Sequence, residues 1–320
     1  MNKMTRIMVV LMVSVGVLGA TPIESLSEMM KKMPENIRLI SGMENEQNYV
    51  IRLHAIHDLG TELSPREIDA LLAFTAIHLN DQKKPGLKKL EFNGLKNELF
   101  IILMNQRIKP SLGGALIAML NDREMDITWR DYCVQFMGQW YFMEPDQKVR
   151  QQMLQTMQQS LSDNQKSIAG TALTSLFSIY LKTKIGGEEL AQKAVSLLQD
   201  ESTHNLTKIS ALDIAARFKR PEALEEARKL LKDASKTDKT VLMVAIATIG
   251  TLGNSSDLAM LEEMGKSYDS RMRIPVVRAT ALINHRQKHL FQFVIILQKI
   301  ALINYFFLGK NGFKKHGWLY

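Results

Sequence analysis

Two histidines three residues apart, followed directly by an aspartate, are the residues of this chain whose spacing first suggests a metal site. His54, His57 and Asp58 lie in the segment YVIRLHAIHDLG. On a helix, side chains three apart share a face, so a pair of metal ligands is geometrically feasible. A site would still need a third or fourth ligand. The segment is better interpreted as a helix with Gly60 as its C-cap, where the helix dipole favours a nearby histidine.

The chain has a single cysteine, Cys133, which excludes an intramolecular disulfide framework and a cysteine-based zinc site. Its apolar and aromatic neighbours predict a buried, inert thiol. Paired glycines occur in KIGGEE and SLGGAL, but neither is followed by the Lys-Ser/Thr of a phosphate-binding loop. The sequence therefore predicts no catalytic residue, no cofactor and no metal ion, and a protein that is not an enzyme.

An aromatic cluster in WRDYCVQFMGQWY offers the strongest candidate for recognition of a partner. Aromatic residues at these helical spacings are usually core, but a surplus of Trp and Tyr also suits a binding hot spot. Both interpretations stay open at this point. Arg130 and Asp131 are expected to make contacts between repeats or to cap a helix. The candidate partner-binding residues are Trp129, Arg130, Tyr132, Trp140 and Tyr141.

The elements that must position these residues recur along the chain. In ISALDIAARFKRPEALEEARKLLKD, residues 209–233, one apolar helical stripe ends before Pro221, and a second begins there. A shift of 34 residues places Ala211 on Ala245, and a second shift reaches Ala279, with apolar residues matching around them. A fixed period in this range predicts stacked helix pairs.

The same pattern continues toward the N-terminus with looser spacing, giving about six helix pairs and a seventh that begins at Ile274. The first pair is YVIRLHAIHDLG with SPREIDALLAFTAIHL. Ser64 is its expected N-cap, with Pro65 in the first helical position and Glu67 closing a capping box.

VIRLHAIHDLGTELSPREIDALLAF, ISALDIAARFKRPEALEEARKLL and IPVVRATALIN resemble HEAT repeats, and WRDYCVQFMG resembles a first helix of bacterial proteins of this type. The resemblance covers roughly residues 45–285. It implies an all-α fold, a right-handed, armadillo-like α-solenoid of about six to seven HEAT-like helix pairs, with second helices lining its concave side. The His-Glu pairs of HEAT-type di-iron hydroxylases are absent from the sequence.

Charge is divided unevenly over the 320 residues, although the net charge is +8. All 33 acidic residues lie between 21 and 270, whereas residues 271–320 contain nine Lys and Arg and no acid. The basic excess therefore belongs to the ends of the chain, which argues against binding of nucleic acid by the folded body. The expected organisation is a signal peptide at 1–20, a lead-in or cap at 21–45, the repeats at 46–285 and an atypical segment at 286–320.

The first 20 residues combine the basic MNKMTR with an apolar run of 14 that ends at Ala20, as a secretory signal does. The protein is thus expected to be exported, periplasmic or secreted, with an uncleaved N-terminal anchor as the alternative. The apolar residues 289–309 have three interpretations: a helix that closes the last repeat, a membrane span held by a positive tail, or a segment in a changed reading frame.

Stacked helix pairs create a long groove, which favours a non-catalytic exported scaffold or adaptor that binds another protein or a peptide. Two alternatives remain. One is a membrane-tethered structural protein, and the other is a HEAT-type enzyme or accessory with a site of histidines and carboxylates.

Overall fold

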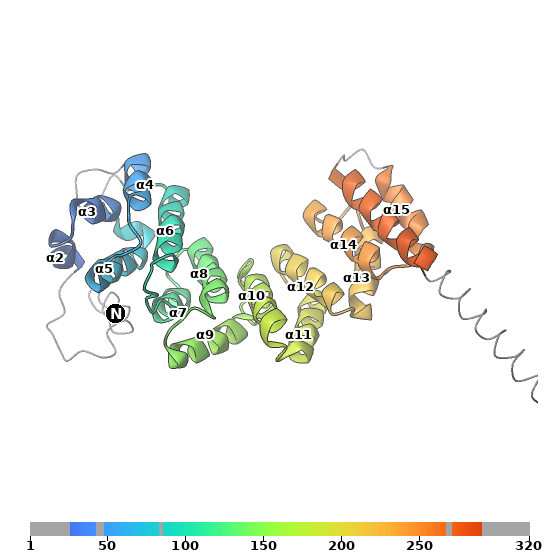
Figure 1. Ribbon diagram of the computed structural model, residues 1–320. Coiled ribbons are helices and arrows are strands. Elements are labelled where there is room, and N and C mark those ends of the chain that lie inside the picture. Colours follow the sequence, from blue (N-terminus) through green and yellow to red (C-terminus); the bar gives the residue numbers. More distant parts are fainter. Residues whose placement is uncertain (1–25, 43–47, 83–85, 267–270, 290–320) are drawn as a thin grey trace, which may run out of the picture. The chain divides into compact units, whose positions relative to one another are not determined.

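The computed structural model describes residues 26–42, 48–82, 86–266 and 271–289, which form helices joined by short connections (Figure 1). No strand occurs in these ranges. The all-α prediction is confirmed for this part of the chain. The predicted signal peptide and nearly all of the apolar segment 289–309 lie outside the described residues.

The six predicted helix pairs are present as helices. Two short helices precede them, α2 (Leu26–Lys31) and α3 (Glu35–Ser41). The pairs are α4 (Tyr49–His57) with α5 (Pro65–Thr75), α6 (Lys89–Met104) with α7 (Gly113–Asn121), α8 (Ile127–Trp140) with α9 (Gln147–Ser160), α10 (Ile168–Thr183) with α11 (Gly187–Gln199), α12 (Asn205–Arg217) with α13 (Pro221–Lys232), and α14 (Lys239–Leu252) with α15 (Leu258–Gly265). Two single 3-10 turns, η1 (Leu79–Asp81) and η2 (Ser255–Asp257), lie in connections, and residues 271–289 form a further helix.

Local side-chain caps account for where several helices begin. The hydroxyl of Ser64 accepts from the backbone N–H of Glu67, and the Glu67 carboxylate accepts from the N–H of Ser64, so the predicted capping box is confirmed. Pro221 opens α13 as predicted. Aspartates cap other helices: Asp126 accepts from Thr128 N at the start of α8.

The prediction of Gly60 as a helix C-cap is wrong. Helix α4 ends at His57 with Asp58 as its C-cap, and Gly60 does not adopt the left-handed conformation of a glycine cap. Leu59 is buried, and the carbonyl of Gly60 accepts from Gln106 Nε2 at 3.0 Å. Gly60 therefore takes part in a tertiary contact and not in the helix cap.

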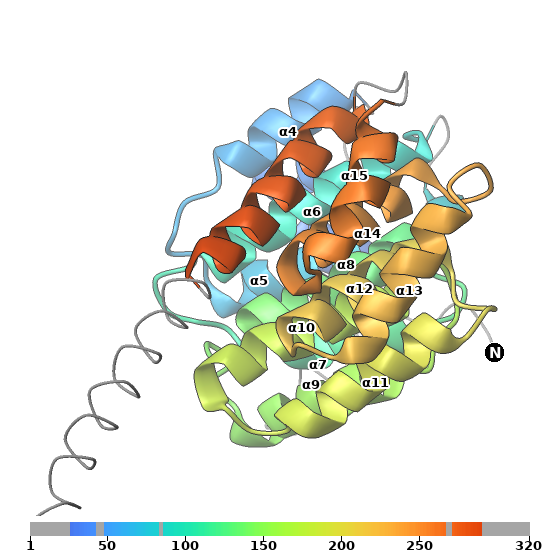
Figure 2. The same ribbon diagram turned by 90° about the vertical axis from the view of Figure 1, so that its right-hand side faces the viewer.

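The described chain divides into two compact units, Met1–Ala211 and Leu212–Tyr320, whose boundary falls within α12. In the first unit α3 packs on α4, α4 on α6, α6 on α8 and α8 on α10. Among the second helices, α7 packs on α9, and α11 packs on α10, beside which it lies in both views (Figures 1 and 2). In the second unit α13 packs on α14.

Residues that share a repeat position share burial. Ala211, Ala245 and Ala279, each 34 residues apart, are at most 1% exposed. The 34-residue period therefore marks the positions at which helices meet, as the sequence predicts.

Small residues allow close helix crossings. A Cβ placed on Gly138 of α8 would lie 2.5 Å from Cβ of Ser175 on α10, and one on Gly170 would lie 2.9 Å from Cα of Thr207 on α12. These distances are shorter than side-chain packing tolerates, so glycine is needed at both crossings.

Candidate functional site

The five predicted partner-binding residues fall into two groups. Trp129, Arg130 and Trp140 are at most 2% exposed, whereas Tyr132 and Tyr141 are partly exposed. The Trp129 ring belongs to a cluster with Phe100 and Phe136, at centroid distances of 5.7 and 6.4 Å. Three of the five side chains therefore belong to the interior, and the two tyrosines are within reach of a partner.

Arg130 joins consecutive helix pairs, as the sequence predicts. Its Nε donates to the carbonyl of Leu120 at the end of α7, at 2.8 Å, and its Nη2 lies 3.1 Å from a carboxylate oxygen of Asp163. The neighbouring Asp131 accepts from the hydroxyl of Thr171 on α10 at 2.7 Å. These bonds satisfy carbonyls and hydroxyls that packing removes from water.

Two other cations repeat the role of Arg130. Arg52 on α4 donates to the carbonyl of Ile40 at the end of α3, through Nε at 3.0 Å and Nη2 at 2.7 Å. Lys96 on α6 donates to the carbonyl of Ile77, just beyond α5, at 2.6 Å. A buried cation on one helix thus binds the end of the helix that precedes its pair, which complements the partial negative charge there.

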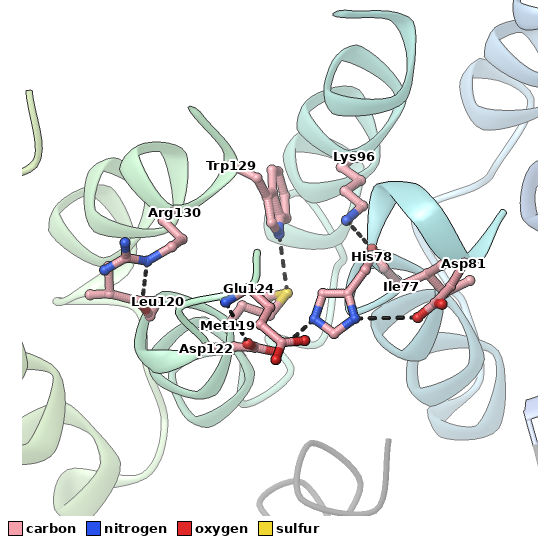
Figure 3. A network of polar contacts seen from close by, with 10 residues as sticks. All are labelled: Ile77, His78, Asp81, Lys96, Met119, Leu120, Asp122, Glu124, Trp129 and Arg130. Carbon is pink, nitrogen blue, oxygen red and sulfur yellow. Dashed lines mark hydrogen bonds and ion pairs between the residues drawn. The ribbon is translucent and has the colours of Figure 1, made fainter. Parts of the chain in front are cut away.

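Figure 3 shows Lys96 with its hydrogen bond to Ile77, on the helix that faces Trp129. Its Nζ lies 4.4 Å from the ring centre of Phe92 and 5.3 Å from that of Trp129. Burial lowers the pKa of Lys96 to about 7. The enclosing rings keep the amine away from solvent. Its role is therefore to bind the backbone carbonyl of Ile77, and not to react with a dissolved substrate.

His78 occupies the partly open side of the same region (Figure 3). Its Nε2 lies 2.7 Å from a carboxylate oxygen of Asp122, and its Nδ1 lies 3.3 Å from one of Asp81. Since Asp122 follows α7 and His78 follows α5, the contact ties two successive connections together. The contact thus holds neighbouring helix pairs together.

Glu144 is fully buried just after α8, a feature that the sequence analysis missed. One oxygen, Oε2, accepts from the N–H groups of Leu112 and Gly113 at the start of α7, at 3.0 and 2.8 Å, and from Trp140 Nε1 at 3.0 Å. The carboxylate therefore caps a helix N-terminus and holds the Trp140 indole, which explains why this candidate residue points inward.

A cleft of about 580 Å³ lies between α9, α10 and α11. Tyr141 and Tyr180 line it, together with the apolar side chains of Leu154, Leu161, Leu176, Ile179, Ile185 and Leu190. Its volume is in the range of about 300–1,000 Å³ that is common for binding sites. Of the five predicted residues, Tyr141 alone lines this cleft.

The turn between α10 and α11 shapes one wall of the cleft. Lys184 and Gly186 both have left-handed backbone conformations, with φ of 59° and 72°. Between them Ile185 is 78% exposed, although it is aliphatic. A Cβ on Gly187 would lie 2.4 Å from the ring of Tyr180, so this glycine makes room for the tyrosine. An isoleucine in a KIGG turn was the sequence signal that could have identified the site.

The chain from the middle of α9 to near the end of α10 carries few charges, whereas Lys182, Lys184 and Glu188 follow it and Glu189 lines the cleft. Residues 151–181 contain only two, Asp163 and Lys166, whereas 23% of the whole chain is charged. The exposed residues of α9 include Gln151, Gln155 and Gln158. Solvated helix faces usually carry charged residues, whereas the cores of protein interfaces contain few of them. The neutral face of α9 beside an apolar cleft therefore resembles an interface more than an ordinary solvated surface.

A second hollow of about 460 Å³ lies across α10, bounded by α8, α10 and the start of α12. Gln135, Gln139, Thr174 and Ser178 are among the residues that line it. The hydroxyls of Thr174 and Ser178 donate to backbone carbonyls of their own helix, at 3.0 and 3.1 Å. They retain only acceptor capacity toward a ligand.

The remaining chemical candidates have structural explanations. His54 and His57 are both exposed on α4, and the described residues hold no group of three or more potential metal ligands. Cys133 is fully buried, and burial raises the pKa of its thiol. Within the described part of the chain, no helix is both long and apolar enough to span a bilayer.

No protein-family model matches this chain, and no curated protein matches it in sequence.

Proposed function

We propose that the protein is a non-catalytic scaffold or adaptor that binds another protein or a peptide through the cleft between α9, α10 and α11. The observation that carries this proposal is an open, mainly apolar cleft, edged by two tyrosines and bordered on one side by residues 151–181, which carry few charges. Centres of protein–protein interfaces combine apolar and aromatic residues with a low content of charge. An apolar helical face or extended segment of the partner is the occupant that suits this lining.

The proposed architecture is a right-handed solenoid of HEAT-like helix pairs. Support for it comes from the series of contacts from α4 through α6 and α8 to α10, and from the 34-residue spacing of buried alanines in the second unit and its border. In such an array each pair buries its apolar stripe against the next, and the surface that remains is extended.

The proposal places the protein outside the cytoplasm, in a periplasm or in the surrounding medium. It rests on the basic and apolar residues 1–20. Pulse-labelling in the native host tests it: a precursor should be converted to a mature chain that begins near residue 21, and a mature chain that keeps residue 1 contradicts cleavage.

Photo-crosslinking tests the cleft directly. A photoreactive amino acid at Ile185 in the cleft wall should give a discrete adduct in the native host. The matched control is Ile108, which is 86% exposed in the connection between α6 and α7 and lies away from the cleft. Absence of an adduct at Ile185, or the same adducts at both positions, contradicts the proposal.

A charged residue placed in the cleft provides a second test of the binding surface. Leu154→Glu should abolish the Ile185 adduct, because a carboxylate would have to be desolvated against apolar groups. Leu90→Glu is the matched control, since Leu90 is 84% exposed at the start of α6. Circular dichroism must show unchanged helicity for both variants. An adduct that survives Leu154→Glu would mean that the cleft is not the binding surface.

A further inference from the structure

The last helix of the described chain, residues 271–289, carries two imidazoles that contact each other. His285 and His289 are both exposed, and their Nε2 atoms lie 3.1 Å apart, with ring centres at 4.4 Å. The two residues are four apart, so the helix itself places them on one face, one turn above the other.

This separation suits shared ligation of one metal ion. Two nitrogens that each lie about 2.0–2.1 Å from a metal are about 2.9–3.4 Å apart when the angle between the bonds is about 90–109°. The observed Nε2–Nε2 distance of 3.1 Å falls inside that interval. A metal could therefore bridge the two nitrogens at this separation once the rings turn their lone pairs toward it, and it would replace the hydrogen bond between them.

The charged neighbours of the pair within the described helix, Arg286 and Lys288, are both basic. Arg286 is directed elsewhere: its Nη1 and Nη2 donate to the carbonyls of Gly250 and Gly253 at the end of α14, at 2.7 and 2.8 Å. Lys288 is exposed. Because residues 271–320 contain no acid, carboxylates from this part of the chain cannot compete for the metal or join its coordination.

We propose that His285 and His289 form a two-point chelate for a divalent transition-metal ion. Imidazole nitrogen favours Zn²⁺, Ni²⁺ and Cu²⁺ over Mg²⁺ and Ca²⁺, with Cu²⁺ bound most tightly. Water completes the coordination, or a donor from a second copy of the chain does, since no third ligand is clustered with the pair among the described residues. The metal joins the two residues across the last described turn of this helix.

Calorimetric titration of the untagged, full-length protein with ZnCl₂, NiCl₂ and CuCl₂ tests the chelate, with MgCl₂ as the ion that should not bind. His285→Ala and His289→Ala should each weaken binding of the three transition metals by at least about tenfold. The double variant should abolish this site.

The chain contains its own matched control. His54 and His57 are exposed on α4 but lie three apart, and His54→Ala/His57→Ala should leave the affinity unchanged. One ion per chain and one ion per two chains both support the chelate, provided that binding depends on His285 and His289. Unchanged binding in the double variant at these positions, equal loss in the α4 variant, or equal binding of Mg²⁺ overturns the proposal.

Discussion

Replacement of Lys96 by methionine should stabilise the protein near neutral pH and remove a pH dependence that the native chain carries. Lys96 is 2% exposed and enclosed by the rings of Phe92 and Trp129. Its Nζ donates a hydrogen bond of 2.6 Å to the backbone carbonyl of Ile77. The charged form of the amine therefore loses more solvation than its neighbours return.

The direction of the effect follows from proton binding. Burial lowers the pKa of Lys96 to about 7 in the folded protein. The unfolded chain keeps the usual lysine pKa of about 10.4, so it binds more protons between these two values. The free energy of unfolding therefore rises with pH in this window, and the gain is lost as the pH falls through about 7.

The change in the free energy of unfolding is large enough to measure. Integration of the proton difference gives an increase on the order of 1–2 kcal/mol in the free energy of unfolding between about pH 7 and pH 8.5, for the native protein relative to Lys96→Met. Near pH 7 the variant should itself be more stable by roughly 2 kcal/mol, because loss of the hydrogen bond to Ile77 offsets only part of the relieved desolvation.

Urea unfolding followed by circular dichroism measures both quantities. Comparison of the two proteins at each pH cancels the other titrating groups, and Lys148→Met provides a control at an exposed lysine. If Lys96→Met has the same pH dependence as the native protein between about pH 7 and 8.5, the buried charge is not the cause, and the reasoning is refuted.

Three further outcomes follow from other buried groups. Glu144→Gln should lower the free energy of unfolding by about 2 kcal/mol, since a neutral amide caps the start of α7 at Gly113 less strongly; a loss below about 0.5 kcal/mol would contradict that role. Gly170→Ala should destabilise by about 1–3 kcal/mol, because its Cβ would meet the backbone of Thr207; any stabilisation in urea unfolding argues against the close crossing. Cys133 should resist a thiol-specific colorimetric reagent at neutral pH until urea is added, because burial raises the pKa of its thiol; rapid modification of the folded protein is the opposing result.

Helix positions were predictable because local interactions decide them. Ser64 and Glu67 cap α5 within four residues of each other, and Pro221 can begin a helix but not continue one. The apolar period marked Ala211 and Ala245 as buried before any contact was known. Such signals lie within one or two turns of the chain, and the sequence displays them directly.

The exposure of the aromatic residues was not predictable in the same way. Trp140 and Tyr141 are adjacent in sequence, yet one binds Glu144 in the interior and the other lines the cleft. Trp and Tyr are both enriched in binding hot spots, so residue type alone does not distinguish the two positions. The difference depends on where α8 ends relative to α7 and α9, which is a tertiary fact.

By itself the sequence determined that the described part of the chain is helical, where its six helix pairs lie and which faces several of them bury, because helix period and caps are local. Tertiary structure decided the charge state of Lys96, the inward position of Glu144 and the cleft that joins Tyr141, Leu154 and Ile185. Each of these depends on residues from different helices, whose approach is set by packing. Desolvation and cleft shape arise only when those helices meet, so no local pattern encodes them.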